Sequence, residues 1–167
     1  MGGIVAQQFV LDYPQHVRKL VLVSTFSELR PSSFKQAYYF LQRMLAVHFI
    51  GLEVQSKIVS RHVFPKVGQE GLRQLLEEQI ASADARAYRA AMRGLGLFSS
   101  RGRLKEIKKP TLIVSGTNDT TVDLSQQKML VDGILGARQI IIPNAGHAVA
   151  IDQPKEFNFA LLKFLIE

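Results

Sequence analysis

Three short apolar runs rich in β-branched residues predict the strands of this chain. They lie at residues 19–25 (KLVLVST), 111–115 (TLIVS) and 139–143 (QIIIP). Their hydrophobic positions are continuous instead of alternating, which is typical of strands buried on both faces of a parallel sheet. We therefore expect three parallel strands with helices against both faces.

Helical patterns surround these runs. Residues 3–13 precede the first strand, 124–135 separate the second from the third, and 154–166 close the chain. Asp152 is the expected N-cap of the last helix, with Pro154 in its first turn. This order is typical of βα units, so the expected fold class is α/β, with a short, three-stranded parallel sheet and right-handed crossovers.

A long insert separates the first two strands. It holds about 85 residues with little strand character, many more than a crossover needs. Its helical candidates are residues 33–49, 52–62, 68–82 and 83–95, with Pro65, Gly94 and Gly96 as expected breaks. We expect an α/β core made of residues 1–30 and 99–167, and a helical cap insertion over residues 31–98.

Composition narrows the chemistry. Cysteine is absent, which excludes a disulfide framework, a thiolate nucleophile and a cysteine zinc site, and makes the cytoplasm the default compartment. The first residues lack the basic region of a signal peptide, and no uncharged apolar stretch reaches 18 residues, so we expect no membrane span. No glycine-rich phosphate loop or ligand-spaced histidine cluster occurs, so neither a cofactor nor a metal is expected.

The net charge of +7 is concentrated in the middle of the chain. Residues 30–109 carry 15 Lys and Arg against 6 Asp and Glu. Such a surface could attract an anionic substrate, an acidic partner protein or nucleic acid. Because the charges are dispersed and no nucleic-acid motif interleaves them, we favour a solvated helical surface and expect no nucleic-acid partner.

Two polar residues follow consecutive predicted strands. Asp119 comes just after the second strand, in TLIVSGTNDTTVD, and His147 follows the third, in RQIIIPNAGHAVAIDQP. Open α/β sheets gather functional groups at the carboxyl ends of their strands. A carboxylate that orients a histidine, which then acts as a general base, would suit this order. Alone, Asp119 is more typical of a turn-former, and His147 of a structural histidine.

With these residues, the chain resembles the α/β-hydrolase superfamily, and more narrowly its cap-bearing esterase and lactonase-like members. The stretch MGGIVAQQFVLDYPQHVRKLVLVST resembles the helix after the nucleophile and the strand that follows it. KKPTLIVSGTNDTTV resembles the strand and turn of the triad acid, which would be Asp119. IIIPNAGHAVAIDQPKEFNFALLKFL resembles the last strand, the triad histidine, which would be His147, and the closing helix. Asp123 stands where the family often has proline, and we expect it to be an N-cap.

The resemblance places the nucleophile one position before Met1. In the motif G-x-S-x-G, Gly2 would be the final glycine, with Gly3 next to it, and Met1 would supply an oxyanion-hole amide. Ser24 and Ser115 lie at strand ends outside such a turn, so neither is expected to replace the nucleophile. We accordingly expect a C-terminal portion of a hydrolase, inactive and poorly soluble alone, with an unpaired strand edge open to self-association.

The function implied by the resemblance is hydrolysis of a small-molecule ester, lactone or related acyl bond by a Ser-His-Asp mechanism, with an aspartate nucleophile as the alternative. Two other functions remain open: a non-catalytic remnant that serves as an interaction module, and an esterase for acyl groups on an acidic carrier protein. Phe34, Tyr38 and Met44 are candidate substrate contacts, although this aromatic run could equally pack the cap onto the sheet.

Overall fold

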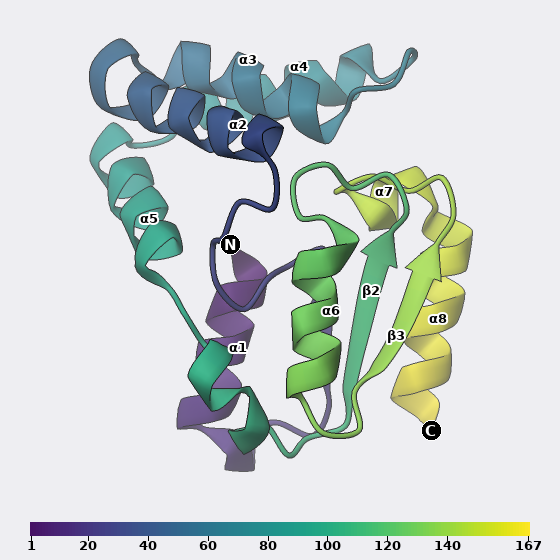
Figure 1. Cartoon of the computed structure of the whole chain (residues 1–167). Helices are drawn as coiled ribbons and strands as arrows, with labels where there is room; N and C mark the ends of the chain where they lie inside the picture. Colours follow the sequence, from purple (N-terminus) through teal and green to yellow (C-terminus); the bar gives the residue numbers. More distant parts are fainter. The chain divides into compact units, whose positions relative to one another are not determined.

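The computed structural model describes all 167 residues, which divide into two compact units (Figure 1). The core unit comprises Met1–Arg30 and Leu97–Glu167, and the helical unit comprises Pro31–Gly96. All three strands belong to the core unit, and the helical unit is formed by consecutive helices. The chain therefore leaves the core unit after its first strand and returns before its second.

The core unit is built on a parallel sheet with the order β1-β2-β3. The strands are β1 (Leu20–Val23), β2 (Thr111–Gly116) and β3 (Arg138–Ile142). In register, Leu22 lies opposite Ile113, and Val114 lies opposite Ile140. The predicted fold class, α/β with a three-stranded parallel sheet flanked by helices, is confirmed.

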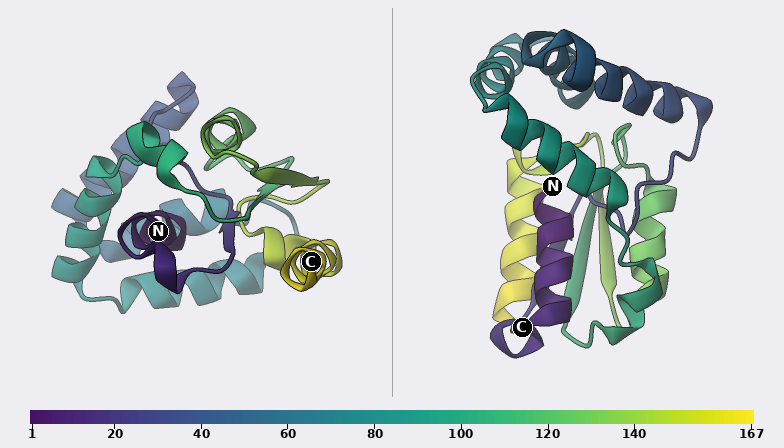
Figure 2. Two further views of the ribbon diagram at one scale, coloured as in Figure 1. Left: turned by 90° about the horizontal axis from the view of Figure 1, so that it is seen from below. Right: turned by 90° about the vertical axis from the view of Figure 1, so that its left-hand side faces the viewer.

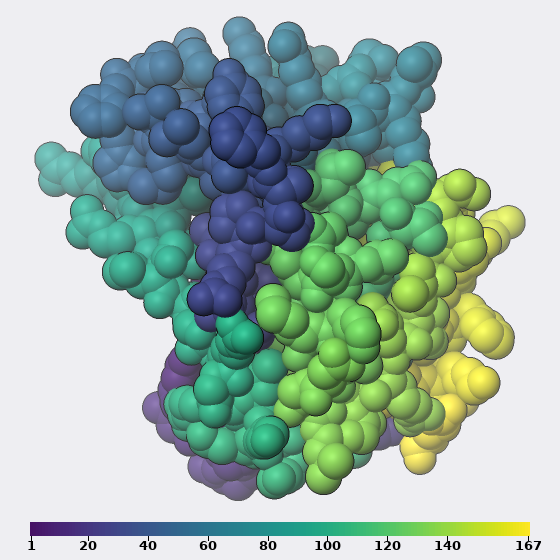
Figure 3. Space-filling model, viewed as in Figure 1, coloured from purple at the N-terminus to yellow at the C-terminus, as the bar shows by residue number.

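Helices cover both faces of β2, whose six residues are all buried. Ile113 packs in one cluster with Val10 of α1 and Leu130 of α6, whereas Val114 packs in another with Phe164 of α8 (Figures 1 and 2). In the space-filling view the side chains of α6 cover the sheet from the near side (Figure 3). The helices and turns of this unit are α1 (Gly2–Asp12), η1 (Pro14–His16), η3 (Arg101–Glu106), α6 (Leu124–Gly133), α7 (Val149–Asp152) and α8 (Pro154–Ile166).

The expectation of burial on both faces holds for β2 but is wrong for β3. Ile140 and Ile141 are 36% and 45% exposed, while Ile142 is buried. The reason is packing, because the buried cluster around Val114 and Phe164 includes Ile142 and neither of the two preceding isoleucines. An apolar run therefore predicted the strand correctly without predicting which of its faces is covered.

The helix ends of the core unit agree with the sequence in two cases and differ in a third. Helix α8 begins at Pro154 as predicted, and Asp123 caps α6 in a reciprocal capping box with Gln126. Asp152 is not the N-cap of α8, because Gln153 holds that position. Asp152 instead ends α7, a four-residue helix that is too short to leave a periodic signal.

The helical unit contains the four expected α-helices. They are α2 (Phe34–Leu45), α3 (Leu52–Val63), α4 (Glu70–Ala81) and α5 (Ala85–Leu97), with a π-helical turn, η2 (Ala46–Ile50), after α2. Gly94 and Gly96 lie inside α5, so the predicted break there is wrong. Glycine lowers helix propensity by about 1 kcal/mol, which neighbouring residues can offset. None of the chain's helices has both the length and the apolar composition needed to cross a membrane.

One glycine controls how closely the loops after β2 and β3 approach each other. A Cβ atom at Gly116, the last residue of β2, would overlap the main-chain carbonyl oxygens of Ala145 and Gly146. Backbone cannot move aside as a flexible side chain can. Gly116 is therefore required by the close contact of two loops.

Replacing Gly116 with Ala should destabilise the core unit by about 2 kcal/mol, since overpacking a well-packed site typically costs 1–3 kcal/mol. Urea unfolding followed by circular dichroism measures this change. Gly102→Ala is the matched control, because no atom lies within 4 Å of a Cβ at that position, and its effect should stay within about 0.5 kcal/mol. Equal stability of the two variants would contradict the packing argument.

Candidate active site

The candidate site lies at the carboxyl edge of the sheet, where the loops after parallel strands meet. Asp119 follows β2, and His147 follows β3. The start of α1 lies at the same edge, because a Cβ at Gly3 would overlap the side chain of Thr25, just after β1. Three segments that are distant in sequence thus converge on one edge of the core unit.

The Asp119 carboxylate is fully buried and accepts hydrogen bonds from its own turn. Its Oδ1 atom accepts from the backbone N–H groups of Thr121 at 2.9 Å and Val122 at 3.0 Å. The turn-forming role considered from the sequence is therefore real. It also fixes the orientation of the carboxylate, so that Oδ2 remains for another donor.

His147 supplies that donor. Its Nδ1 atom lies 3.0 Å from Oδ2 and 3.2 Å from Oδ1 of Asp119. An ionised carboxylate only accepts hydrogen bonds, so the geometry assigns the hydrogen to Nδ1 and the lone pair to Nε2. The His147 side chain is 30% exposed, and Nε2 has no hydrogen-bond partner within the chain. The imidazole is thus fixed on one side and available on the other.

Main-chain hydrogen bonds tie the two loops together. The Asn118 N–H donates to the Ala145 carbonyl at 2.8 Å, and the Asn144 N–H donates to the Thr117 hydroxyl at 2.9 Å. Asn144 has a φ of 58°, a left-handed conformation that asparagine tolerates better than most residues. These contacts, together with Gly116, set the spacing between the acid and the imidazole.

Gln127 stabilises the turn that contains Asp119, and the sequence did not predict this role. This residue of α6 is fully buried, and its Nε2 donates to the Val122 carbonyl at 2.8 Å. Its Oε1 accepts from the Ser115 hydroxyl at 2.7 Å, which in turn accepts from Gln139 at 2.9 Å. The spacing of residues could have indicated this role. Gln127 lies on the same helix face as the buried Leu130 and Ile134, and a polar side chain on an apolar face needs a hydrogen-bond partner.

Asp152 braces the histidine loop. Its Oδ2 atom accepts the backbone N–H of Gly146, the residue before His147, at 2.6 Å. The sequence predicts this carboxylate as the N-cap of α8, a position that Gln153 occupies instead. The Asp152 side chain reaches back to the loop because α7 folds the chain over by a single turn.

Met1, Gly2 and Gly3 form the start of α1. Met1 is the N-cap residue, and its carbonyl accepts from the N–H of Ile4 at 3.0 Å. Gly3 is required by its contact with Thr25, whereas nothing lies within 4 Å of a Cβ at Gly2. Within this chain, close packing against another segment therefore occurs at Gly3 and not at Gly2.

The two serines considered as substitutes are both buried. The Ser115 hydroxyl is fully engaged with Gln127 and Gln139. Ser24 follows β1 with a φ of 45° and is 7% exposed. Neither is an exposed hydroxyl, in agreement with their interpretation as strand-end residues.

The other histidines lie in different surroundings. His16 lies near Tyr13, with ring centroids 6.5 Å apart, His48 Nδ1 lies 2.9 Å from the Met44 carbonyl, and His62 stacks on Tyr39. No group of three or more His, Asp or Glu side chains is arranged to hold a metal ion. His147 is thus distinguished by its hydrogen bond to the buried carboxylate of Asp119.

The candidate substrate contacts lie on α2 in the helical unit. Phe34, Tyr38 and Met44 are 91%, 57% and 42% exposed. Within the same aromatic run Tyr39 is buried, so this residue packs the helical unit itself. The role of the three exposed side chains in substrate binding stays a prediction.

Comparison with known proteins agrees with this geometry. RutD of Rhizobium rhizogenes is 26% identical over 170 residues, which cover 99% of this chain and 64% of RutD. Monoacylglycerol lipase abhd6-B of Xenopus laevis is 27% identical over 178 residues, covering 99% and 52%. The crystal structure of the enol-lactonase from Burkholderia xenovorans superposes with a TM-score of 0.88 at 20% identity, covering all of this chain and 63% of the lactonase.

These proteins share the fold and are longer than this chain, which spans about half to just under two thirds of their lengths. The sequence also matches the family described as serine aminopeptidase, S33, over residues 1–154. That match includes the start of α1, the acid turn and the histidine loop. The chain belongs to the serine aminopeptidase S33 family, within the α/β-hydrolase superfamily.

Proposed function

We propose that the protein hydrolyses an ester, lactone or related acyl bond, with His147 as general base and Asp119 as its orienting acid. One observation carries the proposal: the Asp119 carboxylate binds Nδ1 of His147 while Nε2 stays available. This arrangement prepares an imidazole to take a proton from a nucleophile and to return it to a leaving group. The same feature weighs against the non-catalytic alternative.

The proposed mechanism assigns the nucleophile to the position before Met1, by the family motif. A serine hydroxyl there would attack the acyl carbon as its proton passes to Nε2 of His147. The imidazolium would then protonate the departing alcohol, and water would release the acyl group by the same steps. The Met1 N–H would donate to the oxyanion. Serine is preferred to aspartate because Met1, Gly2 and Gly3 follow.

The names of the relatives support the class of substrate. An enol-lactonase and a monoacylglycerol lipase both act on an acyl carbon bonded to oxygen, and RutD carries a provisional name as a carbamate hydrolase. All three chemistries need a nucleophile, a base and an oxyanion site. The bond cleaved by this protein is therefore proposed as an acyl ester or lactone.

Turnover of a p-nitrophenyl ester by the whole protein tests the assignment. We expect His147→Ala to lower kcat/KM by about 10³-fold or more, because the nucleophile then lacks the general base that removes its proton. His16→Ala is the matched control, since His16 lies before β1 at the opposite edge of the sheet. It should change kcat/KM less than about twofold. An active His147→Ala variant would refute the role of this residue.

The DNA immediately upstream of the Met1 codon tests the nucleophile separately. We expect an in-frame Gly-x-Ser directly before Met1. A Gly-x-Asp in its place would change the nucleophile to aspartate and leave the roles of Asp119 and His147 intact. An in-frame stop codon directly before Met1 would refute the assignment to that position.

The tautomer of His147 can be tested in the whole protein by a measurement that does not depend on turnover. In Asp119→Asn the amide oxygen should keep the two turn hydrogen bonds at the Oδ1 position, which puts the NH₂ group opposite Nδ1. Nδ1 must then accept, so the hydrogen moves to Nε2. Long-range ¹H–¹⁵N NMR of the imidazole should show this reversal. Asp123→Asn, which changes the cap of α6, should leave the Nδ1–H tautomer in place.

A further inference from the structure

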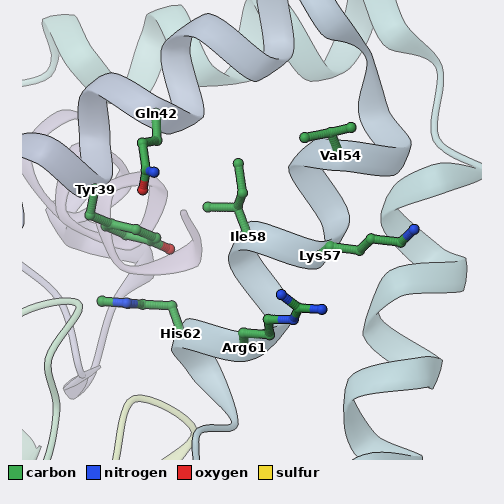
Figure 4. Close-up of a pocket in the computed structure, with 7 residues that line it drawn as sticks. All are labelled: Tyr39, Gln42, Val54, Lys57, Ile58, Arg61 and His62. Carbon is green, nitrogen blue, oxygen red and sulfur yellow. The ribbon is translucent and has the colours of Figure 1, made fainter.

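A groove in the helical unit combines two cations with an apolar wall (Figure 4). Its volume is about 440 Å³, within the range that holds small organic ligands. Helices α2 and α3 form it, and no acidic residue lines it. The lining residues are Tyr39, Gln42, Val54, Lys57, Ile58, Arg61 and His62.

Neither cation of the groove is neutralised by the chain. Lys57 and Arg61 lie one turn apart on α3, and neither forms an ion pair. Like charges at this spacing weaken a helix slightly, so the arrangement is not explained by helix stability. The positive potential on this side of α3 is therefore open to an external anion.

The nearest acidic groups on the adjoining elements are either engaged or do not pair with these cations. Arg61 also borders a second groove, between α3 and α4, where Glu70 binds Arg73 at 2.6 Å and Glu77 accepts from the Ser60 hydroxyl at 2.5 Å. Glu53 precedes Lys57 by one turn of α3 without forming an ion pair with it. The charge of the first groove thus stays positive after these carboxylates are taken into account.

A buried arginine lies near Tyr39, one of the lining residues of the groove. Tyr39 and His62 stack there with ring centroids 3.7 Å apart and planes inclined by 14°. The Arg43 guanidinium lies 5.5 Å from the centroid of Tyr39. Arg43 is only 9% exposed, has no carboxylate partner, and its Nε makes no hydrogen bond. Burying a cation without an anion is costly, so Arg43 adds positive potential near the Tyr39 end of the groove without a carboxylate of the chain to offset it.

The remaining lining restricts the kind of anion. Val54 and Ile58 present aliphatic side chains on α3, and Gln42 adds an amide on α2. A small hydrated anion would leave the aliphatic wall in contact with water, whereas an apolar body would cover it. The lining therefore matches a ligand with one charged end and one apolar end.

We propose that this groove binds an organic carboxylate with an apolar chain, its charged end at Lys57 and Arg61 and its chain against Val54 and Ile58. The site lies wholly within the helical unit, and its occupation does not depend on the proposed catalysis. Under the proposed function, hydrolysis of an acyl bond releases a carboxylic acid. An acid with an apolar chain would then be a product of the protein as well as a ligand of this groove.

Octanoate binding to the whole protein, measured by calorimetry and by ¹H–¹⁵N NMR, tests the site. We expect saturable binding of one octanoate, with shift changes confined to α2 and α3. The double variant Lys57→Gln/Arg61→Gln should raise the Kd about tenfold or more, because charge-assisted contacts to the carboxylate are lost. Both residues are exposed, so the fold should survive, which the same NMR spectra report.

The control is Lys35→Gln/Arg86→Gln, which removes the same charge from exposed positions on α2 and α5 outside the groove. It should leave the Kd within about twofold. Acetate and octanol should each bind at least tenfold more weakly than octanoate, since each lacks half of the proposed contacts. Three outcomes would overturn the proposal. They are equal affinity for octanoate and either probe, an equal rise of the Kd in both double variants, and no saturable binding of octanoate.

Discussion

Burial of the Asp119 carboxylate is the constraint that organises the core unit. A carboxylate with no solvent contact must receive hydrogen bonds, because an unpaired buried charge is very costly. Two N–H groups of its own turn satisfy Oδ1, and the imidazole of His147 satisfies Oδ2. The acid thus needs the histidine for its own stability, and the histidine is held in one orientation as a consequence. The hydrogen bond between Asp119 and His147 therefore serves both the stability of the core unit and the proposed chemistry.

The surrounding scaffold serves to bring these two groups within hydrogen-bond distance. Gly116 allows the two loops to touch, Gln127 fixes the acid turn through the Val122 carbonyl, and Asp152 fixes the backbone beside His147. Each brace is buried or partly buried, where a hydrogen bond is stronger than in water and its loss more costly. Side chains far apart in sequence therefore control a distance of 3.0 Å between two atoms.

The sequence predicted the strands, the parallel sheet and the Asp119–His147 juxtaposition because these follow from apolar runs and from the edge where parallel strands end. It also predicted the Asp123 cap, since capping is local. It did not predict the exposure of β3, the short helix α7 or the true partner of Asp152. These depend on which segments pack together in three dimensions, and a strand shows the same apolar run whether a neighbouring layer covers it or not.

The two units differ in whether the chain itself supplies partners for a buried charge. In the core unit, the buried Asp119 and the partly buried Asp152 both have hydrogen-bond partners from the chain itself. In the helical unit, the buried Arg43 guanidinium forms no ion pair; it donates to Met92 Sδ at 3.2 Å and lies 5.5 Å from the centroid of the Tyr39 ring. Native structures rarely leave such a group uncompensated. The two units therefore differ in how a buried charge is compensated: by hydrogen bonds from N–H groups around Asp119 in the core unit, and by a ring and a sulfur around Arg43 in the helical unit.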